Sequence, residues 1–262
     1  MKTQNIFSPS SYKLFGYSFL ILFFELALIR FIPSNVRITA YFINLVLVAA
    51  FLGMGIGIMR ANREKNLTQF FPPLLLLLVG ICVYFSNIIV TAPRLGEAMF
   101  VIYADISPHT REWGMVPVVS IFFTFSALPF IALGYAMGRE FKKFPALHAY
   151  AINTAGSLAG LLVFSLLSYF STPPIIWFSL GGLLYLFLTG KQQSLVVSTI
   201  CLGLIFFLVQ NLYQKDHEIW SPYYKINQYS ESNLTTINVN GSLHQYMINF
   251  SPSPNIKNPF AN

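Results

Sequence analysis

The chain has 262 residues, of which 55% are hydrophobic and 10% are charged. Soluble domains carry about 25% charged residues, so this composition excludes an ordinary soluble protein and predicts an integral membrane protein. The formal net charge of +7 would favour nucleic-acid binding in a soluble chain. Here the basic residues flank apolar runs, so we interpret them as determinants of membrane topology and expect no nucleic-acid partner.

Seven apolar runs recur between the N-terminus and residue 213. A helix of about 20 apolar residues crosses a bilayer, which makes these runs candidate spans. We predict transmembrane helices at 13–31, 38–59, 70–91, 115–138, 148–170, 175–190 and 192–213. Pro33 is expected to end the first of them. The predicted fold class is an all-α integral membrane domain of about seven transmembrane helices over 1–213, followed by a polar tail over 214–262 that holds a short β-hairpin.

Glu25 lies deep inside the first apolar run, where a carboxylate costs about 2.5–3.5 kcal/mol even on the mildest insertion scale. Arg30 points about 140° away around the same helix and can reach the interface instead. In a tight hairpin whose turn is centred after residue 34, Asn44 lies at the depth of Glu25 and is its predicted partner. Asn153 is a less favoured partner because it lies near the end of its helix.

Two roles are open for this intramembrane carboxylate. It can hold two helices together as a polar clamp, or it can form part of a proton or substrate site. A transporter usually shows several such groups or broken helices near the midplane, and this sequence shows one deep carboxylate, so the clamp is favoured.

Small residues recur four positions apart in three of the predicted helices. The pairs are Gly53 and Gly57, Gly134 and Gly138, Gly156 and Gly160, and Ala155 and Ala159. Such spacing lets helix backbones approach closely, so we predict helix–helix packing at these positions. A glycine-lined conduit or hinge is the alternative.

No catalytic constellation is evident in the sequence. It lacks a phosphate-binding glycine loop, a Ser/His/Asp set and a cysteine pair at zinc spacing. Asp105, His109 and Glu112 would share one face of a helix, but Pro108 interrupts that segment. We therefore predict no catalytic residue, metal site or cofactor in this chain.

The tail carries strand signals. Residues 219–226 are rich in aromatic and β-branched types, 234–239 alternate in the manner of a strand, and 243–250 form a return strand. Asn240-Gly241 between the last two is a strong signal for a two-residue hairpin turn.

Three features of this tail resemble the small β-domain at the start of spermidine synthases, the polyamine aminopropyltransferases. These are Ser221-Pro222-Tyr223-Tyr224, the Asn240-Gly241 turn and Gln245. Glu25 and Arg30 in the first span, the glycine-rich end of the second and the 150–160 segment also resemble the multi-helix region that precedes a spermidine synthase-like domain in some bacterial proteins.

The resemblance implies that the chain works with a polyamine synthase, but two of its residues differ from the family pattern. Tyr224 stands where the family has a glutamine that helps hold decarboxylated S-adenosylmethionine, and Asn240 stands where the family has an aspartate. No glycine-rich nucleotide loop follows residue 250 in this sequence, so we expect no aminopropyl transfer by this chain alone. The predicted function is a membrane-anchoring or substrate-passing module that works with a separate synthase-like catalytic chain. The alternative is a stand-alone small-molecule transporter of the inner membrane.

The basic residues predict the orientation, because positive residues favour the cytoplasmic side. Nine lie on the N-terminal side of the predicted spans and four on the opposite side, before the tail. We therefore expect a multi-pass protein of the bacterial cytoplasmic membrane with its N-terminus inside. Seven spans then place the tail outside, although polyamine substrates are cytosolic, so either one span is miscounted or the tail works outside.

Overall fold

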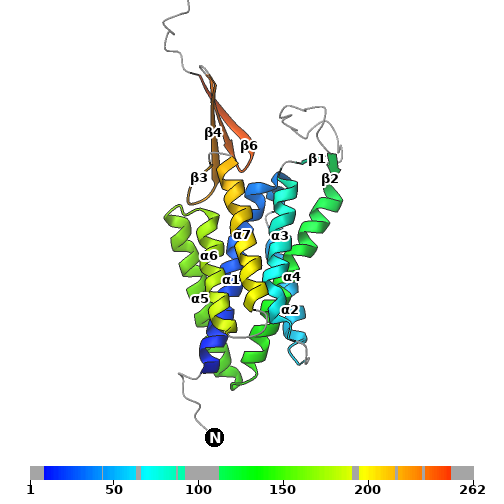
Figure 1. Ribbon diagram of the computed structural model, residues 1–262, viewed down its shortest axis with the longest axis vertical. Helices are drawn as coiled ribbons and strands as arrows, with labels where there is room; N and C mark the ends of the chain where they lie inside the picture. Colours follow the sequence, from blue (N-terminus) through cyan, green and yellow to red (C-terminus); the bar gives the residue numbers. More distant parts are fainter. Residues whose placement is uncertain are drawn as a thin grey trace, which may run out of the picture.

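The computed structural model describes residues 9–42, 44–62, 66–86, 88–91, 112–190, 195–215, 218–231 and 234–248. Within them, seven α-helices form a bundle and a small antiparallel sheet lies at one end of it (Figure 1). The helices are α1 (Pro9–Asn35), α2 (Leu45–Met59), α3 (Phe71–Phe85), α4 (Met115–Phe141), α5 (Ala146–Tyr169), α6 (Pro174–Thr189) and α7 (Leu195–Lys215). The start of α1 lies at the end of the bundle away from the sheet (Figure 1).

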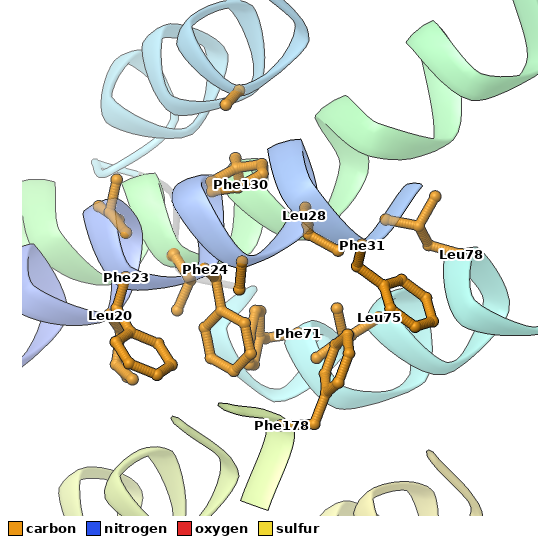
Figure 2. Close-up of a cluster of buried hydrophobic side chains, with 14 of the residues drawn as sticks. Leu20, Phe23, Phe24, Leu28, Phe31, Phe71, Leu75, Leu78, Phe130 and Phe178 are labelled. Carbon is orange, nitrogen blue, oxygen red and sulfur yellow. The ribbon is translucent and has the colours of Figure 1, made fainter. Parts of the chain in front are cut away.

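Helix α1 is the centre of the bundle. It contacts α2, α3, α4, α5 and α6. Of its most apolar 18 residues, 72% are buried, against 17% of those of α5. Figure 2 shows phenylalanines of α1 among those of its neighbours. The ring centroid of Phe24 lies 5.1 Å from that of Phe71 on α3, and Phe31 lies 5.1 Å from Phe178 on α6. A helix that is apolar on all sides is expected at such a buried position.

Five helical segments are long and apolar enough to cross a membrane: Pro9–Asn35, Thr68–Phe85, Met115–Phe141, Ala146–Tyr169 and Leu195–Leu212. The other two, α2 and α6, are apolar but have only 15 and 16 residues. At 1.5 Å per residue each is about 22–24 Å long, shorter than the roughly 30 Å hydrocarbon core. The structure therefore supports membrane-spanning length for five of the seven predicted spans.

The predicted end of the first helix at residue 31 is wrong, because α1 continues through Pro33 to Asn35. A proline lacks only its own N–H, so Pro33 removes the single bond to the Ile29 carbonyl and the helix continues beyond it. Two side chains add hydrogen bonds in the following turn. Ser34 Oγ donates to the Arg30 carbonyl at 2.7 Å, and Asn35 Nδ2 donates to the Phe31 carbonyl at 2.7 Å.

Two other predicted helix boundaries also differ from those in the structure. The segment Arg37–Tyr41 forms a 3-10 helix, so α2 begins at Leu45 and not at 38. Helix α3 ends at Phe85 and not at 91, because β1 (Ile89–Thr91) pairs in parallel with β2 (Glu112–Gly114). The other four predicted helices agree with the structure to within three residues at each end.

The predicted close packing at small residues is confirmed between α2 and α4. A Cβ added to Gly53 or Gly57 would lie closer than 3.0 Å to the backbone of α4, and one added to Gly134 would lie 2.6 Å from the Met54 carbonyl oxygen. Gly53 faces Ala127 and Ala61 faces Gly138, so the two helices run in the same direction.

Helices α1 and α5 form a second parallel pair of the same kind. Gly156 lies against the Phe15 carbonyl and Gly160 against the Phe19 carbonyl. The space in front of these glycines is filled by the neighbouring backbone, which fits packing and leaves no room there for the alternative of a conduit.

The tail forms one four-stranded antiparallel sheet in the order β3 (Glu218–Trp220), β4 (Lys225–Glu231), β5 (Leu234–Val239) and β6 (Ser242–Ile248). Asn240 and Gly241 have φ values of 50° and 73° and connect Val239 to its partner Ser242. Two positive φ angles in a two-residue loop are typical of a type I′ turn, so the predicted hairpin is confirmed. The single strand predicted over 219–226 is instead two strands, because Ser221 N donates to the Tyr224 carbonyl at 2.9 Å and closes a turn between them.

Candidate functional site

The candidate site is the junction at which the sheet meets the end of α1. We define it by Arg30, Lys225, Glu218 and Asn240 together with the groups that they contact. It joins the first helix to residues almost two hundred positions later in the chain.

Arg30 links three helices to the sheet. Its guanidinium donates hydrogen bonds to Ser168 Oγ on α5 and to the Ser221 carbonyl after β3. The guanidinium carbon also lies 4.9 Å from the ring centroid of Trp177 on α6 and 5.4 Å from that of Trp220 on β3. A cation between desolvated indoles is worth up to about 2 kcal/mol per contact.

The interfacial role predicted for Arg30 is therefore incomplete. Arg30 is half-buried, and its Nε is buried without a hydrogen-bond partner among the described residues. A charge near the end of an apolar run is normally expected to extend toward water. Here the sheet covers the end of the helix, and α5 and the turn after β3 supply the polar partners instead.

A buried ion pair lies beside Arg30. Lys225 Nζ is 2.7 Å from Glu218 Oε1, with side-chain exposures of 6% and 3%. Trp220 Nε1 donates to Glu218 Oε2 at 3.0 Å, and Lys225 donates to Asn35 Oδ1 at 3.3 Å. Both oxygens of the carboxylate are thus occupied, as a desolvated ion pair requires for stability. This arrangement holds β3 and β4 on the last turn of α1.

The hairpin turn also contacts the junction. Asn240 Oδ1 accepts from the Lys225 backbone N–H at 3.0 Å, and Asn240 N donates to the Lys225 carbonyl at 2.8 Å. Ser34 Oγ lies 3.4 Å from Asn240 Oδ1. Gly241 lies against Arg37, whose Cγ would be 3.3 Å from an added Cβ.

The tail residues predicted from the family motif divide into two groups. Ser221 and Pro222 present backbone carbonyls to Arg30 and Ser168, the second at 2.8 Å, and Asn240 and Gly241 lie at the junction described above. The exposed group comprises Tyr223, Tyr224 and Gln245, the last on β6 opposite Ile237. Four of the seven motif residues therefore lie at the junction with the helices, and the other three are exposed.

Glu25 is 3% exposed, and none of the described residues forms a hydrogen bond or ion pair with it. The predicted depth match with Asn44 is wrong. Glu25 lies ten residues before the end of α1 at Asn35, about 15 Å along the helix. Asn44 is exposed and lies directly before the start of α2, because the turn is centred several residues later than predicted.

Asn153 binds another residue of α1. Ser18 Oγ lies 2.8 Å from Asn153 Oδ1 on α5 and 2.8 Å from the Leu14 carbonyl oxygen. The α1–α5 pair is therefore held by this polar contact as well as by its glycines. The polar contact that links α1 to a neighbouring helix is therefore made by Ser18 and not by Glu25.

No three His, Cys, Asp or Glu side chains gather into a potential metal site in the described ranges. Asp105 and His109 lie outside the described residues, so the prediction for that connection stays a prediction. Cys82 and Cys201 are both buried free thiols.

Comparison with models of protein families, with curated proteins and with solved structures found no match. The resemblance of the tail to spermidine synthases therefore stays a hypothesis based on its own residues. No local pattern in the sequence predicts the contacts of Arg30 and Lys225, because their partners lie up to 191 positions away in the chain.

Proposed function

We propose that this chain is the membrane-anchoring module of a spermidine synthase-like protein. In this proposal the helices hold the small sheet at the membrane surface, and a synthase-like catalytic chain binds to that sheet. The observation that carries the proposal is the junction of Arg30, which donates hydrogen bonds to α5 and to the turn after β3 and lies over the Trp177 ring of α6.

A fixed sheet suits an anchoring role. Isolated small sheets are marginal in water, and this one gains its support from α1 through Lys225 and Asn35. The docked sheet leaves the side chains of Tyr223, Tyr224 and Gln245 exposed. These side chains are available to a partner without any rearrangement of the sheet.

The proposal includes a location in the bacterial cytoplasmic membrane with seven spans and the N-terminus inside. The five long apolar helices support membrane association. The two shorter helices can span the bilayer by local thinning and by extension of flanking side chains, at a modest cost.

The test begins with the reading frames next to the gene. We expect one of them to encode a glycine-rich nucleotide-binding domain. When the two chains are expressed together, that domain is expected in the membrane fraction with the wild-type anchor and reduced about tenfold there with Arg30→Gln. Lys13→Gln, an exposed basic residue at the other end of α1, is the matched control and should leave retention unchanged.

The anchoring proposal fails if no neighbouring frame encodes such a domain, or if the domain stays soluble beside the wild-type anchor. It also fails if Arg30→Gln and Lys13→Gln retain the domain equally.

A small-molecule transporter is the second candidate, and the state of Glu25 favours it. A buried carboxylate without a partner among the described residues is a functional candidate inside a bundle. Purified protein in liposomes should take up radiolabelled putrescine if this candidate is right, and Glu25→Gln should abolish the uptake. Uptake equal to that of protein-free liposomes would exclude putrescine transport and leave the anchoring proposal in place.

A further inference from the structure

A cluster of basic side chains lies where α2 and α4 end together, at the end of the bundle away from the sheet (Figure 1). It consists of Arg60, Arg139 and Lys142, all exposed. Arg60 directly follows α2, and the other two belong to the end of α4. The anchoring role proposed above uses these charges only for membrane orientation and does not require them to lie together.

Close helix packing brings the three residues together. Gly57 and Gly134 let the two parallel backbones touch, and an added Cβ on Gly138 would lie 3.0 Å from Ala61 Cβ. Beyond this contact Lys142 Nζ donates to Asn62 Oδ1 across the two chain segments. The basic residues that follow each helix therefore form one surface and not two.

The nearest described carboxylate does not neutralise this surface. Glu140 is buried and its Oε2 lies 2.7 Å from Lys143 Nζ, which takes up its charge. Two helix C-termini contribute roughly −0.5 charge each, so the three basic residues leave a net charge of about +2. Helix dipoles explain why cations gather here, but they do not balance them.

An exposed apolar row leads along α2 to the same corner. Leu52 and Met59 are seven residues apart, on one side of the helix, with exposed fractions of 47% and 84%. Phe51 and Ile58 repeat the spacing beside them, at 54% and 38%. In a membrane protein these side chains face acyl chains, and the basic cluster lies at the depth of the headgroups.

Arg139 is held in place at this corner. Its Nη1 donates to Tyr135 Oη at 3.2 Å, and its guanidinium carbon lies 5.7 Å from the centroid of the same ring. Tyr135 is itself fully buried, so the arginine is fixed against α4 while its remaining donors stay exposed. Fixed guanidinium donors match the oxygens of a phosphate group.

We propose that the corner formed by Arg60, Arg139 and Lys142 binds the phosphate of an anionic phospholipid, with the acyl chains along the exposed row of α2. The combination of a net positive headgroup site and a continuous apolar row distinguishes a lipid from a free phosphate ion. Basic residues near a membrane surface each strengthen binding to anionic lipids about fivefold. The predicted orientation places this corner in the cytoplasmic leaflet, where anionic lipids are available.

The test measures lipid binding to purified protein in a zwitterionic detergent by native mass spectrometry, with phosphatidylglycerol and phosphatidylcholine as probes. We expect phosphatidylglycerol to bind at least tenfold more tightly than phosphatidylcholine. Arg60→Gln with Lys142→Gln should weaken phosphatidylglycerol binding about 25-fold, on the basis of about fivefold per residue. Arg37→Gln, an exposed basic residue at the sheet end, should leave it unchanged.

Two further measurements separate loss of charge from loss of fold, and a lipid from a free phosphate ion. Arg60→Lys with Lys142→Arg preserves the charges and should restore binding, which separates loss of charge from loss of fold. Inorganic phosphate at the same concentration should not compete with the lipid. Equal weakening by Arg37→Gln, equal binding of the two lipids, or competition by inorganic phosphate would each overturn the proposal.

Discussion

Charged side chains at the end of α1 decide how the tail of this protein is held. Arg30 binds through aromatic rings and hydrogen-bond acceptors without a carboxylate among the described residues. Lys225 instead forms a buried ion pair with Glu218. A substitution has different consequences at the two sites. Replacing one member of the ion pair leaves the other as a buried charge without a partner.

The ion pair gives the prediction at the residue scale. Lys225→Met leaves the Glu218 carboxylate buried and is expected to destabilise the docked sheet by about 3–5 kcal/mol. The double variant Lys225→Met with Glu218→Leu removes both charges and should be less destabilised than the single variant. Hydrogen exchange of the β3 and β4 backbone amides in detergent measures the free energy of opening.

Gln228→Ala, on the exposed part of β4, is the control for this measurement. If the double variant opens as easily as the sum of its two single variants predicts, the pair does not act as a coupled buried unit.

At the scale of elements, the bundle contains two parallel helix pairs that meet through glycine. Helices α2 and α4 touch at Gly53, Gly57 and Gly134, and α1 and α5 touch at Gly156 and Gly160. Both pairs consist of helices that are not neighbours in the chain. The chain between the two members of each pair must therefore cross back along the bundle, and α1 contacts five of the other helices.

The glycine contacts predict a sharp difference between two glycines of α2 that lie two residues apart. Gly57→Ala forces the α2 and α4 backbones apart and should lower the free energy of unfolding by about 1–3 kcal/mol. Gly55→Ala is the matched control because no atom lies within 4 Å of its added Cβ. It should be neutral or stabilise the protein by up to about 1 kcal/mol through helix propensity.

Thermal unfolding in detergent, followed by circular dichroism, compares these two variants with the wild type. A Gly57→Ala protein as stable as the Gly55→Ala protein would contradict close packing between α2 and α4.

At the scale of the whole molecule, an odd number of alternating helices separates the start of α1 from the sheet (Figure 1). The exposed basic residues Lys13, Arg60 and Lys142 lie toward one end, and the sheet lies at the other. This distribution favours a cytoplasmic position for the end opposite the sheet.

Single cysteines test this orientation. In a chain whose Cys82 and Cys201 are replaced by alanine, Tyr246→Cys on β6 should react with a membrane-impermeant maleimide in spheroplasts. Arg60→Cys should react only after lysis. The reverse pattern would place the N-terminal end outside, and labelling of both positions in spheroplasts would contradict an odd number of crossings.

The number and order of the helices follow from the sequence because each apolar run is local and long enough to indicate its own helix. The Asn240-Gly241 turn is likewise local, since two residues with positive φ suffice to define it. The helix ends at Asn35 and Leu45 differ from the predicted ones because Pro33 removes only one helical hydrogen bond and because Arg37–Tyr41 forms a 3-10 helix.

The sequence by itself determined that the chain is mostly helical with long apolar segments, and that Asn240 and Gly241 form a hairpin turn. Only the tertiary structure decided that α1 lies at the centre, that Glu25 does not meet Asn44, and that Arg30 holds residues 191 positions away. The physical reason is that composition and turn geometry act between near neighbours. The partners of a buried charge depend instead on which distant segments pack around it.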